Sequence, residues 1–425
     1  MKRLLAFVIA LLLVFTLIGC NGQESSSAPP VQTTKPVPGE TTGADPEPSG
    51  DDEIDWNNLS DEELYEMAKE EGGIINVYAG SGKMLKTGKA FLAKYPDLKL
   101  EVYDLDQDEA KGKIKTENET GNITADVLHT KDTAGEIYYD YLPMGYIETY
   151  YPTDLVANIP DNLLTYGLPF YSSMNLWYYN NSAFPDGCPL DNWWDIVHVK
   201  EDGTPKWKLI TKNLGSETAY IALLSSFAIN SDQMAAAYED YYGEPITYTY
   251  DAELAEVEAN NAGFEFIWRL SQHPGLTFIE DGDEIVQAVH FAYEEGGEHA
   301  LGFASASKLD NRDDGYNIEW VTGLAPYTAM MNCNYMYVIS GCDNPAGARL
   351  FIRFQMSKEG FDSSFNALGN WPVDSSLPNE ENPFTMAEFG PEVNGAITPD
   401  IEALYDIFLD AQDSWIHWYD MNPNK

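Results

Sequence analysis

The order of strand-like and helix-like segments near the start of the folded body is the strongest constraint on the fold. The segments are, in chain order, residues 74–79, 84–94, 98–103, 108–120 and 125–129. The first, third and fifth are β-rich or alternate apolar and polar residues, as strands do. The second and fourth read as helices that end at Pro96 and Gly121. A β-α-β-α-β order with short connections predicts a mostly parallel sheet flanked by helices.

Candidate ligand-binding residues follow from this order. In such sheets ligands bind beyond the carboxyl ends of the strands. The residues at those ends are Gly80, Ser81, Gly82, Lys83, His129 and Thr130. Small residues let a ligand approach the backbone, while helix N-terminal amides and Lys83 favour a negative group. A plain strand-to-helix turn that needs glycine for its geometry explains the same loop equally well.

The N-terminus has the pattern of an export signal. Met1-Lys2-Arg3 is basic, and residues 4–18 are apolar apart from Thr16. This run is too short for a stable membrane span. It closes with Leu17-Ile18-Gly19-Cys20, which resembles the bacterial lipobox, whose cysteine becomes the lipidated first residue of the mature protein. We therefore expect a lipoprotein signal peptide at 1–20, lipidation of Cys20 and an extracytoplasmic location; an ordinary signal peptide with a chance cysteine is the alternative.

Residues 21–53 are predicted to be a disordered tether. They are rich in Pro, Ser and Thr and contain few large apolar residues, so they cannot bury enough surface to offset the entropy of ordering. The first helix signal is the capping-box pattern from Ser60 to Glu63, and Gly72-Gly73 ends that helix. The folded body is thus expected from residue 54 to residue 425.

Composition bounds the functions open to this body. The chain of 425 residues has 24 basic and 69 acidic residues, a formal charge of −45. The body is long enough for two lobes. So much acid argues against binding to nucleic acid or to anionic lipid through the body. It could steer cationic ligands, although the solvated surface of an exported protein explains it as well.

No residue pattern indicates an enzyme, a cofactor or a metal site. Cys188, Cys333 and Cys342 make no complete disulfide framework, and burial as small hydrophobes is favoured over a pair across a turn. None of the six histidines lies in an HExxH motif, and there is no Gly-x-Ser-x-Gly elbow. A surface-anchored hydrolase acting on a small or carbohydrate substrate stays open as an alternative, because abundant carboxylates always permit a catalytic pair.

Several short motifs follow one another over about 300 residues of the body. They are Ile75-Asn76-Val77-Tyr78-Ala79-Gly80-Ser81, Ala125-Asp126-Val127, Leu168-Pro169-Phe170-Tyr171 with Leu176-Trp177-Tyr178-Tyr179-Asn180, Gly297-Glu298-His299-Ala300-Leu301-Gly302, Asn344-Pro345-Ala346-Gly347-Ala348 with Ser357-Lys358-Glu359-Gly360, and Asn370-Trp371-Pro372-Val373. In this order and spacing they resemble the extracellular solute-binding proteins of bacterial ABC importers, specifically the iron, phosphonate and polyamine type of family 1.

The resemblance implies a two-lobed periplasmic-binding-protein-like fold of type 2. Each lobe would be a mostly parallel sheet flanked by helices, with crossing strands between the lobes and the ligand in the cleft. Lobe one would comprise 54–171 plus about 330–371, and lobe two about 172–329 plus 372–425. A lipid-anchored monomer of this kind captures a small polar ligand and delivers it to an ABC transporter permease, with no covalent chemistry. Presentation to a membrane receptor, as a sensory binding protein does, stays open.

One departure from the family pattern concerns iron. Ferric-binding members carry an adjacent tyrosine pair after the "GE" element, where this chain has Phe303-Ala304-Ser305-Ala306-Ser307. Ferric iron prefers hard oxygen donors, and Tyr178 and Tyr179, as neighbours on a strand, would point to opposite faces. No metal is therefore expected. Ser305 and Ser307, two apart on a strand, would offer hydroxyls on one side.

The remaining cleft candidates follow from their positions. They are Tyr171, Ser172 and Asn175 at the predicted crossing, Ser216 and Thr218 before an apolar helix, and Tyr327 near the return crossing. An ordinary helix N-cap explains Ser216 and Thr218 equally well. Core packing is favoured over a sugar or amine site for Trp177, Trp193 and Trp194. The sign of the ligand stays open, since the loop that ends at Lys83 suits an organic anion and the overall charge suits a cation.

Overall fold

The computed structural model of the chain describes residues 54–377 and 379–423. By its internal contacts the chain divides into residues 1–53 and residues 54–425, and the second unit carries the described structure. The predicted signal peptide, the lipidation site Cys20 and the tether at 21–53 lie outside the described residues. Within them, no helix is both long and apolar enough to span a bilayer.

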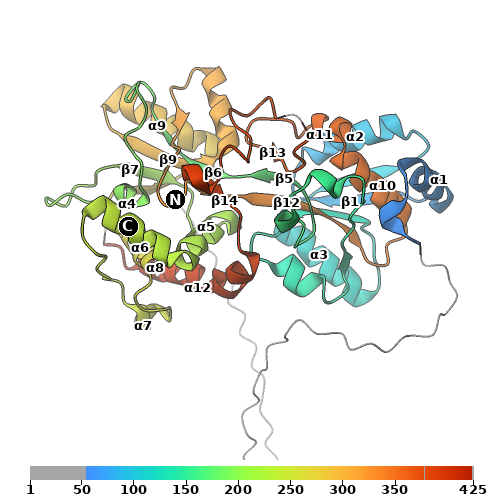
Figure 1. Cartoon of the computed structure of the whole chain (residues 1–425), viewed down its shortest axis with the longest axis horizontal. Coiled ribbons are helices and arrows are strands. Elements are labelled where there is room, and N and C mark those ends of the chain that lie inside the picture. Colours follow the sequence, from blue (N-terminus) through green and yellow to red (C-terminus); the bar gives the residue numbers. More distant parts are fainter. Residues whose placement is uncertain (1–53, 378, 424–425) are drawn as a thin grey trace, which may run out of the picture. The chain divides into compact units, whose positions relative to one another are not determined.

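The first sheet contains seven strands in the order β13-β5-β12-β3-β1-β2, with β4 paired to β12. Its strands are β1 (Ile75–Ala79), β2 (Leu100–Asp104), β3 (Val127–Lys131), β4 (Ile147–Glu148), β5 (Leu168–Ser173), β12 (Asn332–Ile339) and β13 (Trp371–Pro372). Helices packed with it are α1 (Asp61–Glu71), α2 (Met84–Lys94), α3 (Gln107–Thr120), α10 (Pro345–Met356) and α11 (Lys358–Asp362) (Figure 1). The predicted β-α-β-α-β order of residues 74–131 is confirmed.

Local sequence signals explain where these helices begin. The capping box at α1 is present, since the Ser60 hydroxyl accepts from the Glu63 amide and the Glu63 carboxylate accepts from the Ser60 amide. At the other end of α1, the Glu71 carboxylate accepts from the amides of Ala346 and Gly347 at 2.8 and 3.0 Å. One helix thus supplies the N-terminal cap of another that lies far away in sequence.

Asp126 joins two of the sequence motifs inside the first half of the molecule. It is buried, and its carboxylate accepts from the amide of Asn76 at 2.7 Å and from that of Asn344 at 3.0 Å. The Asn344 side-chain amide donates to the same carboxylate at 3.2 Å. Burial of a carboxylate is tolerated when hydrogen bonds satisfy it, so these motif residues hold β1, β3 and the start of α10 together.

The second sheet contains five strands in the order β10-β6-β9-β7-β8. Its strands are β6 (Asn175–Tyr179), β7 (Lys208–Thr211), β8 (Leu276–Phe278), β9 (Ala300–Ser305) and β10 (Glu319–Trp320). The helices of this half are α4 (Trp193–Ile196), α5 (Thr218–Ile229), α6 (Ser231–Tyr242), α7 (Ala252–Ala255), α8 (Ala262–Ser271), α9 (Gly282–Gly296) and α12 (Ile401–Asp420). Short helical segments are Trp56–Asn58, Ile137–Tyr141, Val156–Asn158, Asp161–Leu163, Ala306–Asp314 and Pro391–Val393.

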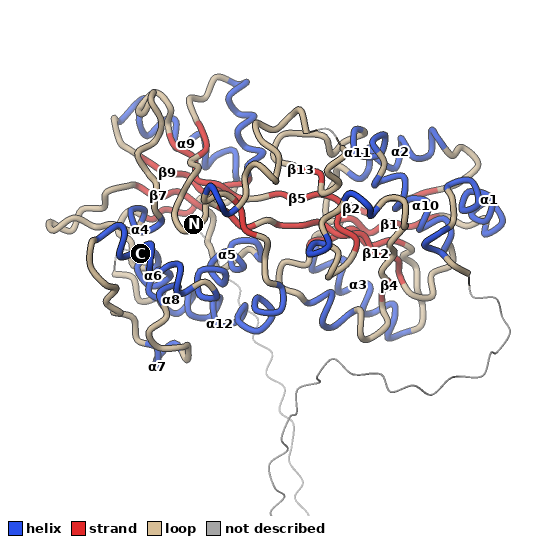
Figure 2. Tube along the Cα trace, viewed as in Figure 1, coloured by secondary structure: helices blue, strands red, loops and turns tan. Residues whose placement is uncertain are grey.

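Single residues separate strands where the chain passes between the two halves. Met174 separates β5 of the first sheet from β6 of the second, and Met331 separates β11 (Ala329–Met330), which belongs to a two-stranded sheet, from β12 of the first sheet. Figure 2 shows the strands of these sheets in red. After β13 the chain passes to β14 (Ala396–Ile397), which pairs in parallel with β11. The last helix, α12, packs against α5, α7 and α8. The crossings therefore lie close together in space, as the register of β5 with β12 requires.

The sheets are mixed, not mostly parallel. β1, β2 and β3 pair in parallel as expected, but β12 runs antiparallel to β3, β4 and β5. In the second sheet, β6 is antiparallel to β9 and β10, while β7 is parallel to β8 and β9. The reason is that β12 returns from the other half of the molecule and enters the first sheet in the opposite direction. Local sequence patterns carry no signal for this insertion.

Aromatic side chains dominate the core of the second half. Trp177, Trp193 and Trp194 are buried, which agrees with the favoured core interpretation. The indole of Trp193 donates to the Tyr327 carbonyl at 2.7 Å and that of Trp194 to the Met234 carbonyl at 2.9 Å. Cys188, Cys333 and Cys342 are free thiols, so no disulfide crosses the described part of the chain.

Candidate ligand-binding site

A polar cavity of about 330 Å³ lies between residues of the two sheets. Its lining residues are Lys131, Ser173, Asn175, Lys212, Glu217, Ala219, Tyr220, Glu280, Asp281, Gly282, Ala304, Ser305, Lys308 and Asn332. They come from the ends of β3, β5 and β12 on one side, and from β6, β7 and β9 with the starts of α5 and α9 on the other. Small-molecule sites span about 300–1,000 Å³, so the volume suits a small solute.

The strand register places three of these side chains on one face of the first sheet. Asn332 lies opposite Ser173 of β5, and Asn334, two residues further on, lies opposite Lys131 of β3. Residues directly opposite in an antiparallel pair share a face, and so do residues two apart on a strand. An ammonium, a hydroxyl and an amide therefore converge from three strands.

Lys131 is a cation without a protein counter-ion. Its ammonium makes no hydrogen bond or ion pair within residues 54–377 and 379–423. Burial lowers the pKa of this ammonium, and the attraction of Glu217 opposes the shift without reversing it. Lys131 is half-buried, and a partly desolvated charge without a partner is costly, so this position gains from a ligand that brings an anionic group.

Asn332 has an unsatisfied amide in the same wall. The residue is only 5% exposed, and its Oδ1 is buried with no hydrogen-bond partner among the described residues. Buried side-chain polar atoms are paired in the large majority of cases. An unpaired amide oxygen beside a cavity therefore marks a place where a ligand hydroxyl or amine can donate.

The second sheet contributes hydroxyl and amide groups. Asn175 lies opposite Ser305 in the β6–β9 pairing, so both side chains share a face. The Ser305 hydroxyl lies 3.1 Å from that of Ser307. The expectation that both serines belong to one strand is wrong, because Ser307 lies in the helical segment that starts at Ala306. β6 begins at Asn175, opposite Ser305, so no partner remains to extend β9 further.

Helix α5 begins at the cavity with free amides. Its N-cap residue, Glu217, makes no side-chain capping bond and pairs with Lys212 instead. The amides of Thr218 and Ala219 donate to no group of the described chain. At α9, by contrast, the Asp281 carboxylate accepts from the first amides of its own helix. The positive N-terminal pole is therefore open to an anion at α5 and occupied at α9.

Comparison with known proteins shows the family to which the chain belongs. The family model described as bacterial extracellular solute-binding protein matches residues 86–389. The chain belongs to this family. No curated protein sequence matches the chain. The resemblance inferred from the sequence motifs is thus confirmed, and the family is extracytoplasmic and binds solutes.

Solved structures of similar fold are two-lobed periplasmic binding proteins. The ferric ion-binding protein A of Pasteurella haemolytica, in its apo form, has a TM-score of 0.57 at 15% identity, covering 81% of this chain and 97% of that one. AfuA of Actinobacillus pleuropneumoniae, bound to fructose-6-phosphate, has 0.55 at 15%, covering 82% and 99%. MotA of Agrobacterium tumefaciens B6, in complex with glucopine, has 0.53 at 16%, covering 81% and 99%. At these identities the likeness shows the fold alone.

The structure brings some of the predicted residues of this solute-binding protein to the cavity. Asn175 and Ser305 line it directly. Ser216 and Thr218 line an adjoining cavity of about 380 Å³, which shares Lys131, Glu217 and Ala219 with the first. The Ser216 hydroxyl donates to the Asn213 carbonyl at 2.7 Å and does not cap α5.

The glycine-rich loop after β1 lies outside the two cavities. Gly80, Ser81, Gly82 and Lys83 form the predicted turn into α2, and the Met84 amide donates to the Ser81 carbonyl at 3.0 Å. Burial lowers the pKa of the Lys83 ammonium, opposed by the charge of Asp310. The loop is thus placed at the carboxyl end of β1, as expected, without lining the polar cavity.

Other predicted residues lie beneath the cavity in the core. His129, Thr130, Tyr171 and Ser172 are buried. His129 stacks on Tyr171 with ring centroids 6.1 Å apart. Both stand on the same face of the first sheet as Lys131 and Ser173, two residues earlier on their strands. The predicted strand ends are thus next to the polar cavity, whose lining includes Lys131 and Ser173.

Tyr327 is part of the hydrophobic core of the second half. It is fully buried, stacks on Phe227 at 5.7 Å and shares a hydrogen bond of 2.9 Å with the Ser226 hydroxyl. It lines neither polar cavity. The position of Tyr327 near the crossing suggested that its ring stacks on a ligand. Such stacking would require the packing around Tyr327 to open.

Sequence reasoning missed the charged side chains of the cavity. Lys131 follows directly after His129 and Thr130 at the end of β3, so its position carried a usable signal. Lys212, Glu217 and Glu280 stand just after β7, before α5 and before α9. Their signal was also positional, since each lies at a strand end or a helix start of the second sheet.

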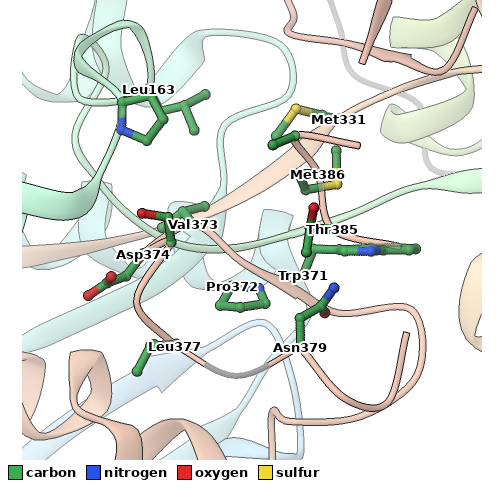
Figure 3. Close-up of a pocket in the computed structure, with 13 residues that line it drawn as sticks. Leu163, Met331, Trp371, Pro372, Val373, Asp374, Leu377, Asn379, Thr385 and Met386 are labelled. Atoms are coloured by element: carbon green, nitrogen blue, oxygen red, sulfur yellow. The ribbon is translucent and has the colours of Figure 1, made fainter. Parts of the chain in front are cut away.

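A third cavity, lined in part by Met331 of the crossing, is apolar. It has a volume of about 320 Å³. Leu163, Met331, Trp371, Pro372 and Met386 stand around it (Figure 3). It offers few polar groups for recognising a polar solute. Among the described residues, no group of three His, Cys, Asp or Glu side chains is arranged to hold a metal ion.

Proposed function

We propose that this chain is a lipid-anchored extracytoplasmic binding protein that captures a small polar ligand between two lobes and delivers it to an ABC transporter permease. Cys20 would carry the lipid and residues 21–53 would form the tether. Lobe one would comprise 54–171 plus about 330–371, and lobe two about 172–329 plus 372–425. The protein would act as a monomer and leave its ligand chemically unchanged.

The observation that carries the proposal is the polar cavity lined by both sheets. Lys131, Ser173 and Asn332 come from the first sheet, and Asn175 and Ser305 from the second. A ligand that contacts both sets stabilises the state in which the two sets approach, and this differential contact shifts the open–closed equilibrium. A permease can then distinguish the loaded form from the empty one.

The short crossings also support capture by lobe closure. Met174 separates β5 from β6, and Met331 separates β11 from β12, while the segment after β13 forms a third and longer passage to β14. Hinges in binding proteins are a few residues that absorb the change in backbone angles. The two crossings of one residue each would place the hinge near these methionines.

A plugged cavity tests the proposal. Ser305→Trp should fill the space between the sheets and abolish ligand binding, measured by calorimetric titration with the ligand recovered afterwards and checked by mass spectrometry. Ser182→Trp is the matched control, because Ser182 is exposed on the loop after β6. Equal binding by both variants, or recovery of an altered ligand, would contradict the proposal.

A further inference from the structure

Two of the three lysines that line the cavity have a carboxylate partner within the protein. Lys212 is paired with Glu217, and Lys308 with Asp283 at 2.7 Å. Asp281 is engaged in capping α9. Lys131 has no such partner. Glu280 of the lining also makes no ion pair, and its side chain is exposed. Lys131 is therefore the one ammonium of the lining without a carboxylate partner, and the cavity is short of an anionic partner at this position.

The uncapped start of α5 adds to this shortage. Two main-chain amides, those of Thr218 and Ala219, have no acceptor among the described residues. Ala219 and Lys131 line both the cavity of about 330 Å³ and the adjoining one of about 380 Å³. The ammonium comes from the first sheet and the helix start from the second half. The ammonium and the helix start both attract an anionic group to the boundary between the cavities.

Asn332 is an independent pointer to a ligand. It is nine-tenths buried or more, lines the cavity, and keeps an unpaired Oδ1. This unpaired oxygen is a separate observation from the charge of Lys131 and from the free amides of α5. A ligand that fills the site needs a hydrogen-bond donor near the acidic group, because an unpaired buried acceptor costs free energy.

We propose that the captured ligand is a small organic acid whose anionic group, carboxylate or phosphoryl, binds between the Lys131 ammonium and the first amides of α5. A hydroxyl or amine of the same molecule donates to Asn332. This assignment rests on the proposed function and decides the sign that the sequence left open. An anion that bridges Lys131 and α5 also ties the two halves together.

The net charge of the protein does not argue against an acid. The formal charge of −45 is spread over 425 residues, whereas binding depends on the charges that face the ligand at short range. A polyamine would place an ammonium beside Lys131 and leave the amides of Thr218 and Ala219 without an acceptor. Glu280 alone, exposed at the rim, would not compensate for this in water.

Fractionated metabolites test the ligand class without a guess at the compound. A small-molecule extract of bacterial cells is separated by ion exchange into anionic, neutral and cationic fractions, and each is added to the full-length chain in detergent. Glucose 6-phosphate with glucose, and butyrate with butyramide, serve as defined acid and neutral pairs, and spermidine as a defined cation. The anionic fraction should raise the Tm by a few degrees.

The outcomes separate this proposal from the proposed function. Stabilisation by the cationic or neutral fraction alone would overturn the acid assignment and leave solute capture standing. Absence of any shift, or chemical conversion of a compound, would count against both. Stabilisation by the anionic fraction and by defined acids, but not by their neutral partners, is the expected result.

Two variants locate the anionic group. Lys131→Met should weaken binding of a stabilising acid by about 10- to 100-fold, while Lys208→Met, on the exposed side of β7, should leave it unchanged. Thr218→Pro deletes one amide donor at the first position of α5, where proline is tolerated and the preceding residue is already extended. It should weaken binding. Unchanged affinity in both Lys131→Met and Thr218→Pro would overturn the proposal.

Discussion

Replacing His129 with leucine should remove a large part of the acid sensitivity of the fold. The imidazole is fully buried, and neither ring nitrogen has a hydrogen-bond partner in the described part of the chain. Phe170, Tyr171 and Phe365 surround it at centroid distances of 6.3, 6.1 and 5.8 Å. Burial, with a smaller contribution from Lys131, lowers the pKa of His129 from 6.5 to about 3. The folded state thus holds this group neutral.

The sign and size of the effect follow from proton linkage. As the pH falls below 6.5, the unfolded chain takes up a proton that the folded chain refuses until about pH 3, so stability is lost across this window. At about 1.4 kcal/mol per pH unit, the loss from this group is about 2.7 kcal/mol between pH 7.5 and pH 4.5.

Asp132 acts in the opposite direction. Burial raises the pKa of its carboxyl from 3.8 to about 6, so the folded state takes up this proton first. Stability therefore rises as the pH falls from 6 toward 3.8, by about 2 kcal/mol at pH 4.5. The total pH dependence does not isolate His129, but the difference between the wild type and His129→Leu does.

Urea unfolding at about pH 7.5 and about pH 4.5 measures this difference. The free energy of unfolding of His129→Leu should fall less than that of the wild type, by about 2–3 kcal/mol. Thr130→Val, at the next position, adds no titrating group and should keep the wild-type dependence. If His129→Leu loses as much stability on acidification as the wild type, the reasoning from burial is wrong.

Three further predictions concern stability and location. Lys131→Met should raise the stability of the ligand-free protein by about 1 kcal/mol, or about 1–2 °C in a thermal melt of a body this size, because it removes a half-buried unpaired charge; a lower Tm would contradict this. Tyr327→Phe should cost about 1 kcal/mol in urea unfolding through the hydrogen bond to Ser226, with ligand affinity unchanged in titration; loss of affinity would return Tyr327 to the site. Cys20→Ser should move the protein from the detergent phase to the aqueous phase of a phase partition; retention in detergent would exclude lipidation at this residue.

Local patterns were sufficient for the first β-α-β-α-β unit. Helix α2 spans Met84–Lys94 as predicted, because an apolar face and Pro96 define both its presence and its end. The capping box at Ser60 was readable for the same reason. Such elements depend on interactions within a few residues, and the sequence displays those directly.

Long-range pairing was not predictable in this way. β12 lies between β3 and β5, although about 200 residues separate it from β3. The resemblance to a known family predicted that the chain crosses back to the first lobe. The periodicity of the sequence did not predict that β12 runs antiparallel to its neighbours. Gly360 illustrates a related limit. A Cβ there would lie 2.0 Å from the Phe354 carbonyl oxygen, so the motif glycine is needed for a close backbone approach that only the structure reveals.

For the candidate site, the sequence indicates which strand ends are close to the cavity. His129 and Tyr171 stand two residues from Lys131 and Ser173 on the same face of the first sheet. Which side chain at a strand end lines the cavity cannot be predicted from the sequence, because strand lengths are set by pairing partners. The missing counter-ion of Lys131 depends on where every carboxylate of the other half lies, and no local pattern contains that information.

Identification of the molecule that co-purifies with the protein tests the central claim most directly. The full-length chain and its Ser305→Trp variant are purified in parallel, denatured, and analysed by mass spectrometry for released small molecules. We predict a small organic acid in about equimolar amount from the wild type, chemically intact and able to rebind, and none from the variant. The same molecule in equal amount from both proteins, or a product that does not rebind, would contradict capture in the cavity between the sheets.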